Sequence, residues 1–150
     1  MKQKKLLTRY QMCQKVAKGC DDDEADYLNI PGSTKLGSGC SRTAFAHPKY
    51  PKVVFKVGCS WDNRAEMRFW KKSPPLVRKF LARCITISKN GTVLCQERIY
   101  ADAKFNEDSW TWEWKDKDIP KSLREYGDRG VHNGCIDKRG QLKIWDYPIG

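Results

Sequence analysis

Two stretches of sequence decide the fold: YGDRGVHN at residues 126–133 and LKIWD at residues 142–146. They place a loop carboxylate at Asp128, an amide five residues later at Asn133, and a second carboxylate at Asp146, where a short strand is expected to end. Side chains of these types bind or orient phosphoryl oxygens and the metal ions that accompany them. The spacing predicts a polar site, with a hairpin between Asn133 and Asp146.

Asp128 and Asp146 also admit a structural interpretation, because Asp is common in turns and at strand ends. The spacing to Asn133, with a strand between the two acids, favours the site. His132 is expected to orient a neighbour or to be exposed rather than to act as a general base, since no nucleophile is marked beside it.

The chain has 150 residues, enough for one domain with a substantial hydrophobic core. Lys and Arg outnumber Asp and Glu by 29 to 18, which gives a formal net charge of +11. Such a balance favours polyanionic partners, such as nucleotide phosphates, nucleic acid or an acidic protein surface. Because the basic residues are spread along the whole chain, we prefer a solvated surface to a nucleic-acid groove.

The cysteines indicate reduced thiols. Their number is odd and no C-x-x-C pair occurs, so a zinc site or a complete disulfide framework is not expected. The seven residues are Cys13, Cys20, Cys40, Cys59, Cys84, Cys95 and Cys135. The N-terminus lacks an apolar signal-peptide region and no apolar run approaches membrane-spanning length, so we expect a cytoplasmic protein with no membrane partner.

Residues 4–18 have apolar side chains at helical spacing, and Gly19 follows as a candidate cap. We expect an amphipathic helix that packs on the rest of the protein, within an N-terminal extension formed by residues 1–30. Residues 31–150 would form the main domain. The acidic cluster at residues 21–24 is expected to be a solvated turn or a helix cap rather than a metal site.

LGSG at residues 36–39 predicts a tight turn whose backbone amides can approach phosphates. The following strand, at residues 53–57, carries Lys56, which could reach the same oxygens. A helix should begin near Ser60 or Asp62, run through Trp70 and stop before Ser73-Pro74-Pro75. Glu66 lies on that helix and is expected to orient Lys56. The alternative is a surface glutamate paired with Arg64 or Arg68.

Asn90-Gly91 between two β-rich runs predicts a hairpin of residues 85–88 and 92–96. Residues 97–99 follow its second strand directly. Further along, Trp110, Trp112 and Trp114 alternate with polar residues. We expect this tryptophan segment to pack in the core, with an exposed docking surface as the alternative.

The order of features along the chain resembles that of a protein kinase-like fold: a glycine turn, a strand lysine, a helical glutamate and then the two C-terminal stretches. Within that superfamily, residues 36–58 and 144–148 are most similar to the early serine/threonine protein kinases of short-tailed bacteriophages. The resemblance covers roughly residues 36–150. Tyr126 and Gly127 depart from the usual His-Arg before the aspartate, and Tyr147-Pro148 from the usual Phe-Gly.

The resemblance implies an α+β fold: an antiparallel N-lobe sheet with one helix, a much shortened C-lobe and an added N-terminal helix. Only four residues follow Asp146, so we expect a reduced form without an activation segment or peptide-binding helices.

The resemblance also implies an ATP- and Mg²⁺-dependent serine/threonine protein kinase that acts on host bacterial proteins and on itself. Asp128 would accept or orient the acceptor hydroxyl, Lys56 would pair with the phosphates, and Asn133 and Asp146 would bind magnesium. The residues implied around the nucleotide are Gly37, Ser38, Gly39, Lys56, Glu66, Gln96, Glu97 and Ile99.

Three other hypotheses stay open. The chain could be a kinase-like protein with weak or no catalysis that binds and inhibits a host protein through its tryptophan segment and positive surface. Nucleic-acid binding is less favoured and predicts a steep loss of affinity with salt. A homo-oligomer in which a second copy completes the cleft is also open.

Overall fold

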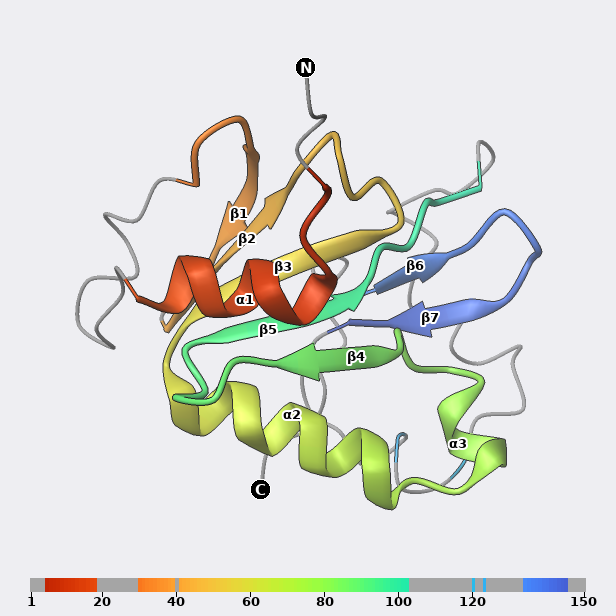
Figure 1. Cartoon of the computed structure of the whole chain (residues 1–150). Helices are drawn as coiled ribbons and strands as arrows, with labels where there is room; N and C mark the ends of the chain where they lie inside the picture. Colours follow the sequence, from red (N-terminus) through yellow and green to blue (C-terminus); the bar gives the residue numbers. More distant parts are fainter. Residues whose placement is uncertain are drawn as a thin grey trace.

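A five-stranded antiparallel sheet forms the centre of the structure, with a smaller two-stranded sheet beside it (Figure 1). The computed structural model describes residues 5–18, 30–39, 41–102, 120, 123 and 134–145. In spatial order the strands of the large sheet are β1 (Thr34–Ser38), β2 (Arg42–Ala46), β3 (Val53–Gly58), β5 (Val93–Glu97) and β4 (Cys84–Ile87). The small sheet pairs β6 (Gly134–Ile136) with β7 (Leu142–Ile144). The helices among the described residues are α1 (Arg9–Ala17), α2 (Ser60–Lys72) and α3 (Pro75–Arg78). The predicted α+β class is confirmed.

The central strand β3 divides the interior into two cores, because successive residues of a strand point to opposite faces of the sheet. On one face, Phe55 and Val57 pack in a cluster that includes Val93 and Cys95 of β5 and the buried residues of α1. Helix α1 lies across this face (Figure 1). The other face carries Lys56 of β3 together with Leu94 of β5, which belongs to the second core.

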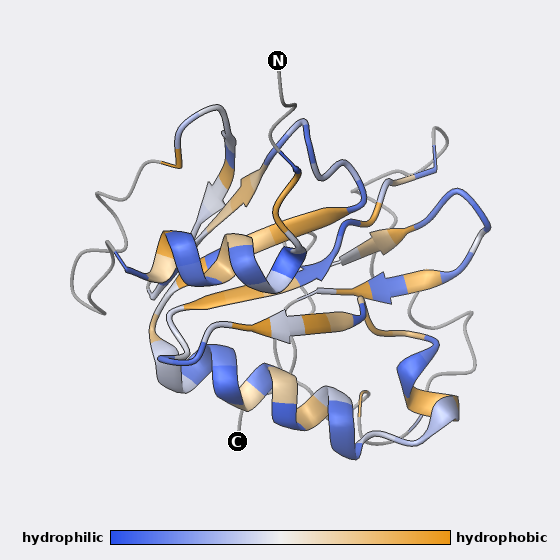
Figure 2. Ribbon diagram, viewed as in Figure 1, coloured by the Kyte–Doolittle hydropathy of each residue, from blue (hydrophilic) through white to orange (hydrophobic). Residues whose placement is uncertain are grey.

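The second core joins α2, the turn after α3 and the small sheet. Ile144 of β7 is buried in this core, and its backbone binds the two residues that flank Leu81. The Ile144 N–H donates to the Phe80 carbonyl at 2.8 Å, and the Ile144 carbonyl accepts from Ala82 N–H at 2.7 Å. Figure 2 shows the hydrophobic residues concentrated on β3 and β5, with hydrophilic residues on the outer side of α2. The small sheet is therefore attached to the same face of the large sheet as Lys56.

Helix α1 begins later than the predicted residues 4–18, at Arg9. The reason is a capping box: Thr8 Oγ1 accepts from Gln11 N–H at 3.1 Å, and Gln11 Oε1 accepts from Thr8 N–H at 2.9 Å. Leu6 and Leu7 precede the helix and are exposed. The prediction that this helix packs on the domain is confirmed, since Cys13 is fully buried in the first core.

Helix α2 and the β4–β5 hairpin lie where the sequence predicts them. The helix runs two residues past Trp70 and ends before Pro74, which cannot continue it. In the hairpin turn, Gly91 has a φ of 80°, the left-handed conformation that glycine adopts without strain. Among the described residues no helix is both long enough and apolar enough to cross a membrane.

The thiols of Cys13 and Cys95 meet between α1 and β5. A hydrogen bond between the two side chains, together with burial, raises the pKa of Cys13 well above its ordinary value. Burial also raises the pKa of Cys135 to about 11, helped by the nearby Asp137 carboxylate. The thiols of Cys13 and Cys135 therefore stay protonated at neutral pH and behave as small apolar side chains.

Gly91→Ala and Gly140→Ala should each lower the free energy of unfolding by about 1–2 kcal/mol, because both glycines have left-handed backbones. Gly91→Ala should cost more, since its Cβ would lie 2.4 Å from Nε of Arg64, whereas nothing lies within 4 Å of a Cβ at Gly140. Urea unfolding measures both losses. Adding Arg64→Ala should recover part of the extra cost at Gly91, because the Ser60 Cβ, 3.0 Å from the added Cβ, remains. An unchanged cost would contradict the clash with Arg64.

Candidate functional site

A buried ion pair between Lys56 and Glu66 lies on the α2 face of the sheet. The Lys56 ammonium donates to Glu66 Oε2 at 3.0 Å and to Oε1 at 3.3 Å. Glu66 is fully buried and Lys56 nearly so. The predicted contact between the strand lysine and the helical glutamate is therefore confirmed. The alternative of a surface glutamate paired with Arg64 or Arg68 is wrong, because Glu66 does not reach the solvent.

Arg42 at the start of β2 is the second cation at Glu66, and the sequence analysis missed it. Its Nη2 lies 2.7 Å from Glu66 Oε1, and its Nη1 donates to Asn63 Oδ1 at 3.3 Å. The signal that could have found it is position: Arg42 stands where a Gly-x-Gly-x-x-Gly pattern would have its third glycine. A long cationic side chain there must project from the strand next to β3.

The N-terminal half of α2 is fastened to the sheet by neutral hydrogen bonds as well. Asn63 is fully buried, and its amide donates to the carbonyls of Lys56 at 3.3 Å and Gly91 at 3.0 Å. The preceding residue, Asp62, accepts through Oδ2 from Ser41 Oγ at 2.5 Å. These bonds fix the rotation of α2 about its axis, which keeps Glu66 directed at Lys56.

The predicted glycine turn at residues 37–39 is strand for its first two residues, since Gly37 and Ser38 end β1 and pair with Ala44 and Thr43 of β2; the connection to β2 begins at Gly39. Gly39 N–H donates to the Arg42 carbonyl at 2.8 Å, and Thr43 Oγ1 lies 3.5 Å from Ser38 Oγ. All of β1 is exposed, and a Cβ added at Gly37 would meet nothing within 4 Å. The turn is thus accessible, and Arg42 connects it to the buried ion pair.

The end of β7 reaches the same ion pair. The Lys56 ammonium donates a hydrogen bond to the main-chain carbonyl of Trp145, 89 residues away in sequence. Trp145 immediately precedes Asp146, and Gly134, which follows Asn133, pairs with Ile144 in the hairpin. The expected hairpin is present, and it brings the neighbour of Asp146 to Lys56.

Several predicted site residues lie outside the described residues. They are Asp128, Asn133 and Asp146, together with His132 and the tryptophan segment at Trp110, Trp112 and Trp114. Within the part of the chain that the structure describes, no group of three or more His, Cys, Asp or Glu side chains is arranged to hold a metal ion. The magnesium ligands named from the sequence therefore stay a prediction.

Gln96 on β5 has the one unsatisfied buried side-chain atom in the described part of the chain. It is fully buried, and its amide nitrogen makes only a long contact of 3.8 Å to Cys84 Sγ. Its Oε1 has no hydrogen-bond partner. Gln96 lies on the same sheet face as Lys56, because it is two residues along β5 from Leu94, the residue paired with Lys56.

Residues 97–99 follow Gln96: Glu97 is the last residue of β5, paired with Val53, and the chain leaves the sheet after it. The N–H of Glu97 donates to the Arg83 carbonyl at 2.7 Å, and the N–H of Arg98 donates to the Lys52 carbonyl at 2.9 Å. These bonds hold Glu97 and Arg98 to the residues just before β4 and β3. The structure thus places Gln96, Glu97 and Ile99 on one continuous stretch that begins on the Lys56 face.

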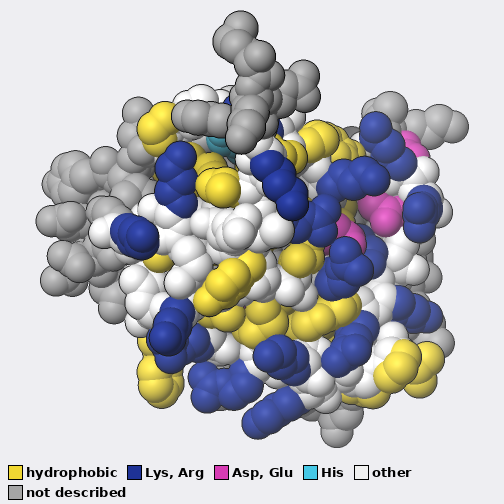
Figure 3. Space-filling model, in the orientation of Figure 1, with side chains coloured by type: hydrophobic (Ala, Val, Ile, Leu, Met, Phe, Trp, Pro, Cys, Tyr) yellow, Lys and Arg dark blue, Asp and Glu magenta, His cyan; other side chains and the backbone are white. Residues whose placement is uncertain are grey.

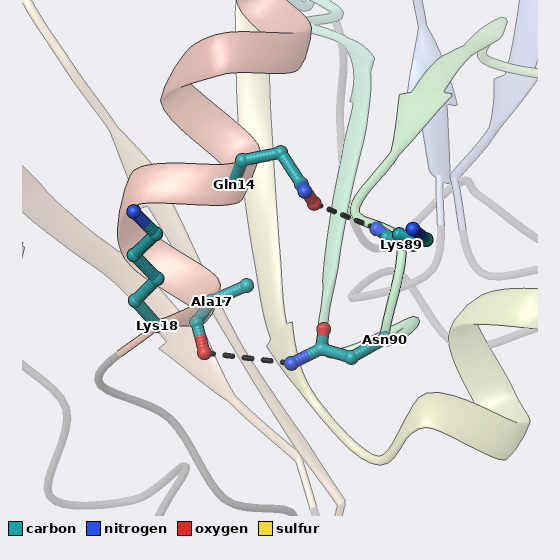
Figure 4. Close-up of a pocket in the computed structure, with 5 residues that line it drawn as sticks. All are labelled: Gln14, Ala17, Lys18, Lys89 and Asn90. Carbon is teal, nitrogen blue, oxygen red and sulfur yellow. Dashed lines mark hydrogen bonds between the residues drawn. The ribbon is translucent and has the colours of Figure 1, made fainter.

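A shallow hollow of about 240 Å³ lies elsewhere, between the end of α1 and the β4–β5 turn (Figure 4). Gln14 Oε1 accepts from Lys89 N–H at 2.7 Å, and Asn90 donates to the Ala17 carbonyl at 3.5 Å. These bonds dock α1 on the hairpin. The hollow contains none of the ion-pair residues, so we assign it a structural role.

Comparisons with protein-family models, with curated proteins and with solved structures found no match for this chain. Its function must therefore be argued from the site itself.

Glu66→Gln should destabilise the protein by about 3 kcal/mol or more, because it leaves two buried cations without their shared carboxylate. Lys56→Met should cost less, about 1–2 kcal/mol, since Arg42 still neutralises Glu66. Chemical unfolding of both variants gives the order. Glu97→Gln is the matched control and should change stability by less than about 0.5 kcal/mol. Equal losses at positions 56 and 66 would contradict the role given to Arg42.

Gln96→Met should leave the protein as stable as the wild type or stabilise it by about 1 kcal/mol, because it removes a buried oxygen that has no partner. Leu94→Met, on the same strand and face, is the control and should cost up to about 1.5 kcal/mol. Thermal and urea unfolding of the ligand-free protein measure both. A larger loss for Gln96→Met than for Leu94→Met would show that the amide is satisfied.

Proposed function

We propose that this chain is a reduced kinase-like phosphotransferase, which binds ATP with Mg²⁺ and transfers a phosphoryl group to a serine or threonine hydroxyl. The observation that carries the proposal is the contact of Lys56 with both Glu66 and the Trp145 carbonyl. A strand lysine, a helical glutamate and the residue before a C-terminal aspartate meet at one buried point. A phosphoryl-transfer site of the kinase type needs the lysine and the glutamate paired and the aspartate beside them.

The arrangement of the sheet supports the same proposal. The accessible glycine turn lies next to the ion pair through Arg42, and Gln96, on the Lys56 face of β5, is followed by the segment that leaves the sheet after Glu97. An anion held near Lys56 would thus have backbone amides of the turn on one side and the 97–99 segment on the other. The order of these features along the chain is the order in which the resemblance to phage serine/threonine kinases presents them.

In this proposal, Lys56 binds the phosphates and Glu66 directs its ammonium group toward them. Asn133 and Asp146 would hold Mg²⁺, and their amide and carboxylate oxygens are ligands that fit a hard cation. The metal would neutralise charge that develops on the transferred phosphoryl group. Asp128 would orient the acceptor hydroxyl. Catalysis would come from positioning and electrostatic stabilisation, because phosphoryl transfer asks for little covalent chemistry from the protein.

A second candidate function is binding to an acidic partner without phosphoryl transfer, for example inhibition of a bacterial host protein. The observation that favours it is the surface: Lys and Arg side chains cover much of the face shown in Figure 3, and few acidic side chains interrupt them. Trp61 and Leu76, each 71% exposed, add apolar anchors on α2 and α3. Such a surface attracts acidic partners whether or not the ion pair serves catalysis.

A thermal-shift titration with ATP separates the two functions. ATP with Mg²⁺ should raise the unfolding midpoint, because a ligand at about 100 times its Kd stabilises the native state by about 2.7 kcal/mol. The shift should shrink when EDTA removes the metal. Transfer of radiolabelled phosphate to the protein itself or to a host extract should follow. Absence of any nucleotide-dependent shift would leave binding to an acidic partner as the better candidate.

Asp146→Asn should reduce phosphate transfer by at least about 100-fold while leaving the fold intact, since it removes a negative charge from the proposed metal site and keeps the size of the side chain. Asp137→Asn is the matched control on the same hairpin. Its side-chain oxygen, which accepts from the N–H groups of Arg139 and Gln141 at 2.9 Å each, is retained in asparagine. Unchanged transfer in Asp146→Asn would contradict the proposed metal site.

A further inference from the structure

The solvent-facing side of helix α2 consists of cations and one tryptophan. The exposed residues of the helix are Trp61, Arg64, Arg68, Lys71 and Lys72, which we call the α2 stripe. They fall within an arc of about 100° of the helix circumference and extend over about 16 Å of its length. Figure 3 shows Lys and Arg side chains gathered along the lower part of the face drawn there, where α2 lies in Figure 1. The stripe is therefore a continuous basic surface with an indole at its N-terminal end.

The cations of the α2 stripe have no carboxylate partner within the described part of the chain. Of the two acids on α2, Asp62 accepts from a serine hydroxyl of the sheet at 2.5 Å, and Glu66 is buried on the opposite side of the helix with its own two cations. Arg64 and Arg68, and again Arg68 and Lys72, are four residues apart, a spacing at which like charges destabilise a helix. An anion bound along the stripe removes this repulsion.

Part of the stripe also has a structural role. Lys71 and Lys72 lie in the last turn of α2, where cations interact favourably with the helix dipole. Arg64 Nη2 donates to a main-chain carbonyl of the β4–β5 turn at 3.3 Å. These roles explain neither Arg68, in the middle of the stripe, nor Trp61, which is 71% exposed. An exposed aromatic ring beside cations is the combination with which proteins bind the bases and phosphates of nucleic acids.

We propose that the α2 stripe binds single-stranded nucleic acid, with its cations on successive phosphates and the Trp61 ring stacked on a base. Arg64, Arg68 and the two lysines follow one another at intervals of about 5–6 Å along the helix, so one flexible strand can meet each in turn. A single strand is favoured over a duplex because stacking needs an open base face, and over an acidic peptide because carboxylate side chains give the indole no ring to stack on. The stripe faces away from Glu66, so this inference is independent of the proposed function.

Fluorescence anisotropy with a labelled oligothymidylate of about 15 nucleotides tests the proposal on the full chain. EDTA is present, so that a Mg²⁺-dependent nucleotide site is not engaged. Arg64→Gln combined with Arg68→Gln should raise the Kd by about tenfold or more at about 0.1 M salt. The slope of log K against log salt should become shallower by about 1.4, because two phosphate contacts are lost. Arg68→Gln alone, which breaks no hydrogen bond among the described residues, should reduce the slope by about half as much and replaces the double variant should that not fold.

Trp61→Ala separates stacking from charge. It should raise the Kd by about fivefold or more and leave the salt slope unchanged, because it removes a base contact and no phosphate contact. Lys35→Gln combined with Lys52→Gln is the matched control. Both lysines are exposed and lie on β1 and on the turn before β3, so this variant loses the same charge away from α2. Its Kd should change by less than about twofold.

Polyglutamate is the competing ligand that identifies an acidic protein partner instead. Displacement of the labelled strand by polyglutamate as effectively as by unlabelled oligothymidylate overturns the proposal, and so does an unchanged Kd in Trp61→Ala. An equal loss of affinity in the control variant overturns it as well, since net charge and not the stripe would then hold the strand. If the wild type binds no oligothymidylate, this inference fails, while binding of ATP with Mg²⁺ is decided separately by the thermal shift.

Discussion

The ion pair between Lys56 and Glu66 is the constraint on which the rest of the structure depends. A carboxylate that is removed from water must have cations and hydrogen-bond donors at fixed positions, or the folded state loses several kcal/mol. Here α2 must lie against the sheet at one rotation, and β2 must present Arg42 at one register. Asn63 serves both requirements: its amide nitrogen binds the β3 backbone and the hairpin turn, which fixes α2, and its Oδ1 accepts from Arg42 of β2. The packing of α2 is thus dictated by charge as much as by apolar contact.

The two faces of the large sheet differ in the polarity of the side chains that they bury. The face under α1 is apolar, with Phe55 and Val57 packed against α1 and the neighbouring strand. The opposite face carries the ion pair, the unsatisfied Gln96 oxygen and the contact with the C-terminal hairpin. Polar groups of this kind lower stability, and proteins retain them mainly where they serve a site. Both faces also bury a hydrophobic core, so the polar groups of the second face lie beside apolar packing rather than in place of it.

Local sequence signals predicted the elements well and the site in part. Asn90-Gly91 specified its hairpin because a left-handed turn favours glycine, and Pro74 marked the end of α2 because the residue before proline leaves the helical region. The Lys56–Glu66 contact was expected from the resemblance to kinases, which need a helical carboxylate beside the strand lysine, and Glu66 is the only acidic residue of α2 past its first turn. Arg42 could not be found in this way, because its partner lies 24 residues away and depends on strand order. The unpaired oxygen of Gln96 is likewise a property of packing, which no local pattern records.

The exposed strand β1 is held in the sheet less firmly than the central strand β3. Its residues bury no side chain, its pairing with β2 is interrupted by an irregularity between Lys35 and Gly37, and within the described part of the chain it pairs with a strand on one side only. Separating β1 from the sheet therefore costs far less free energy than disturbing β3, whose residues are all buried. The centre of the sheet is therefore more resistant to local unfolding than its β1 edge. The turn that Arg42 closes lies between the two.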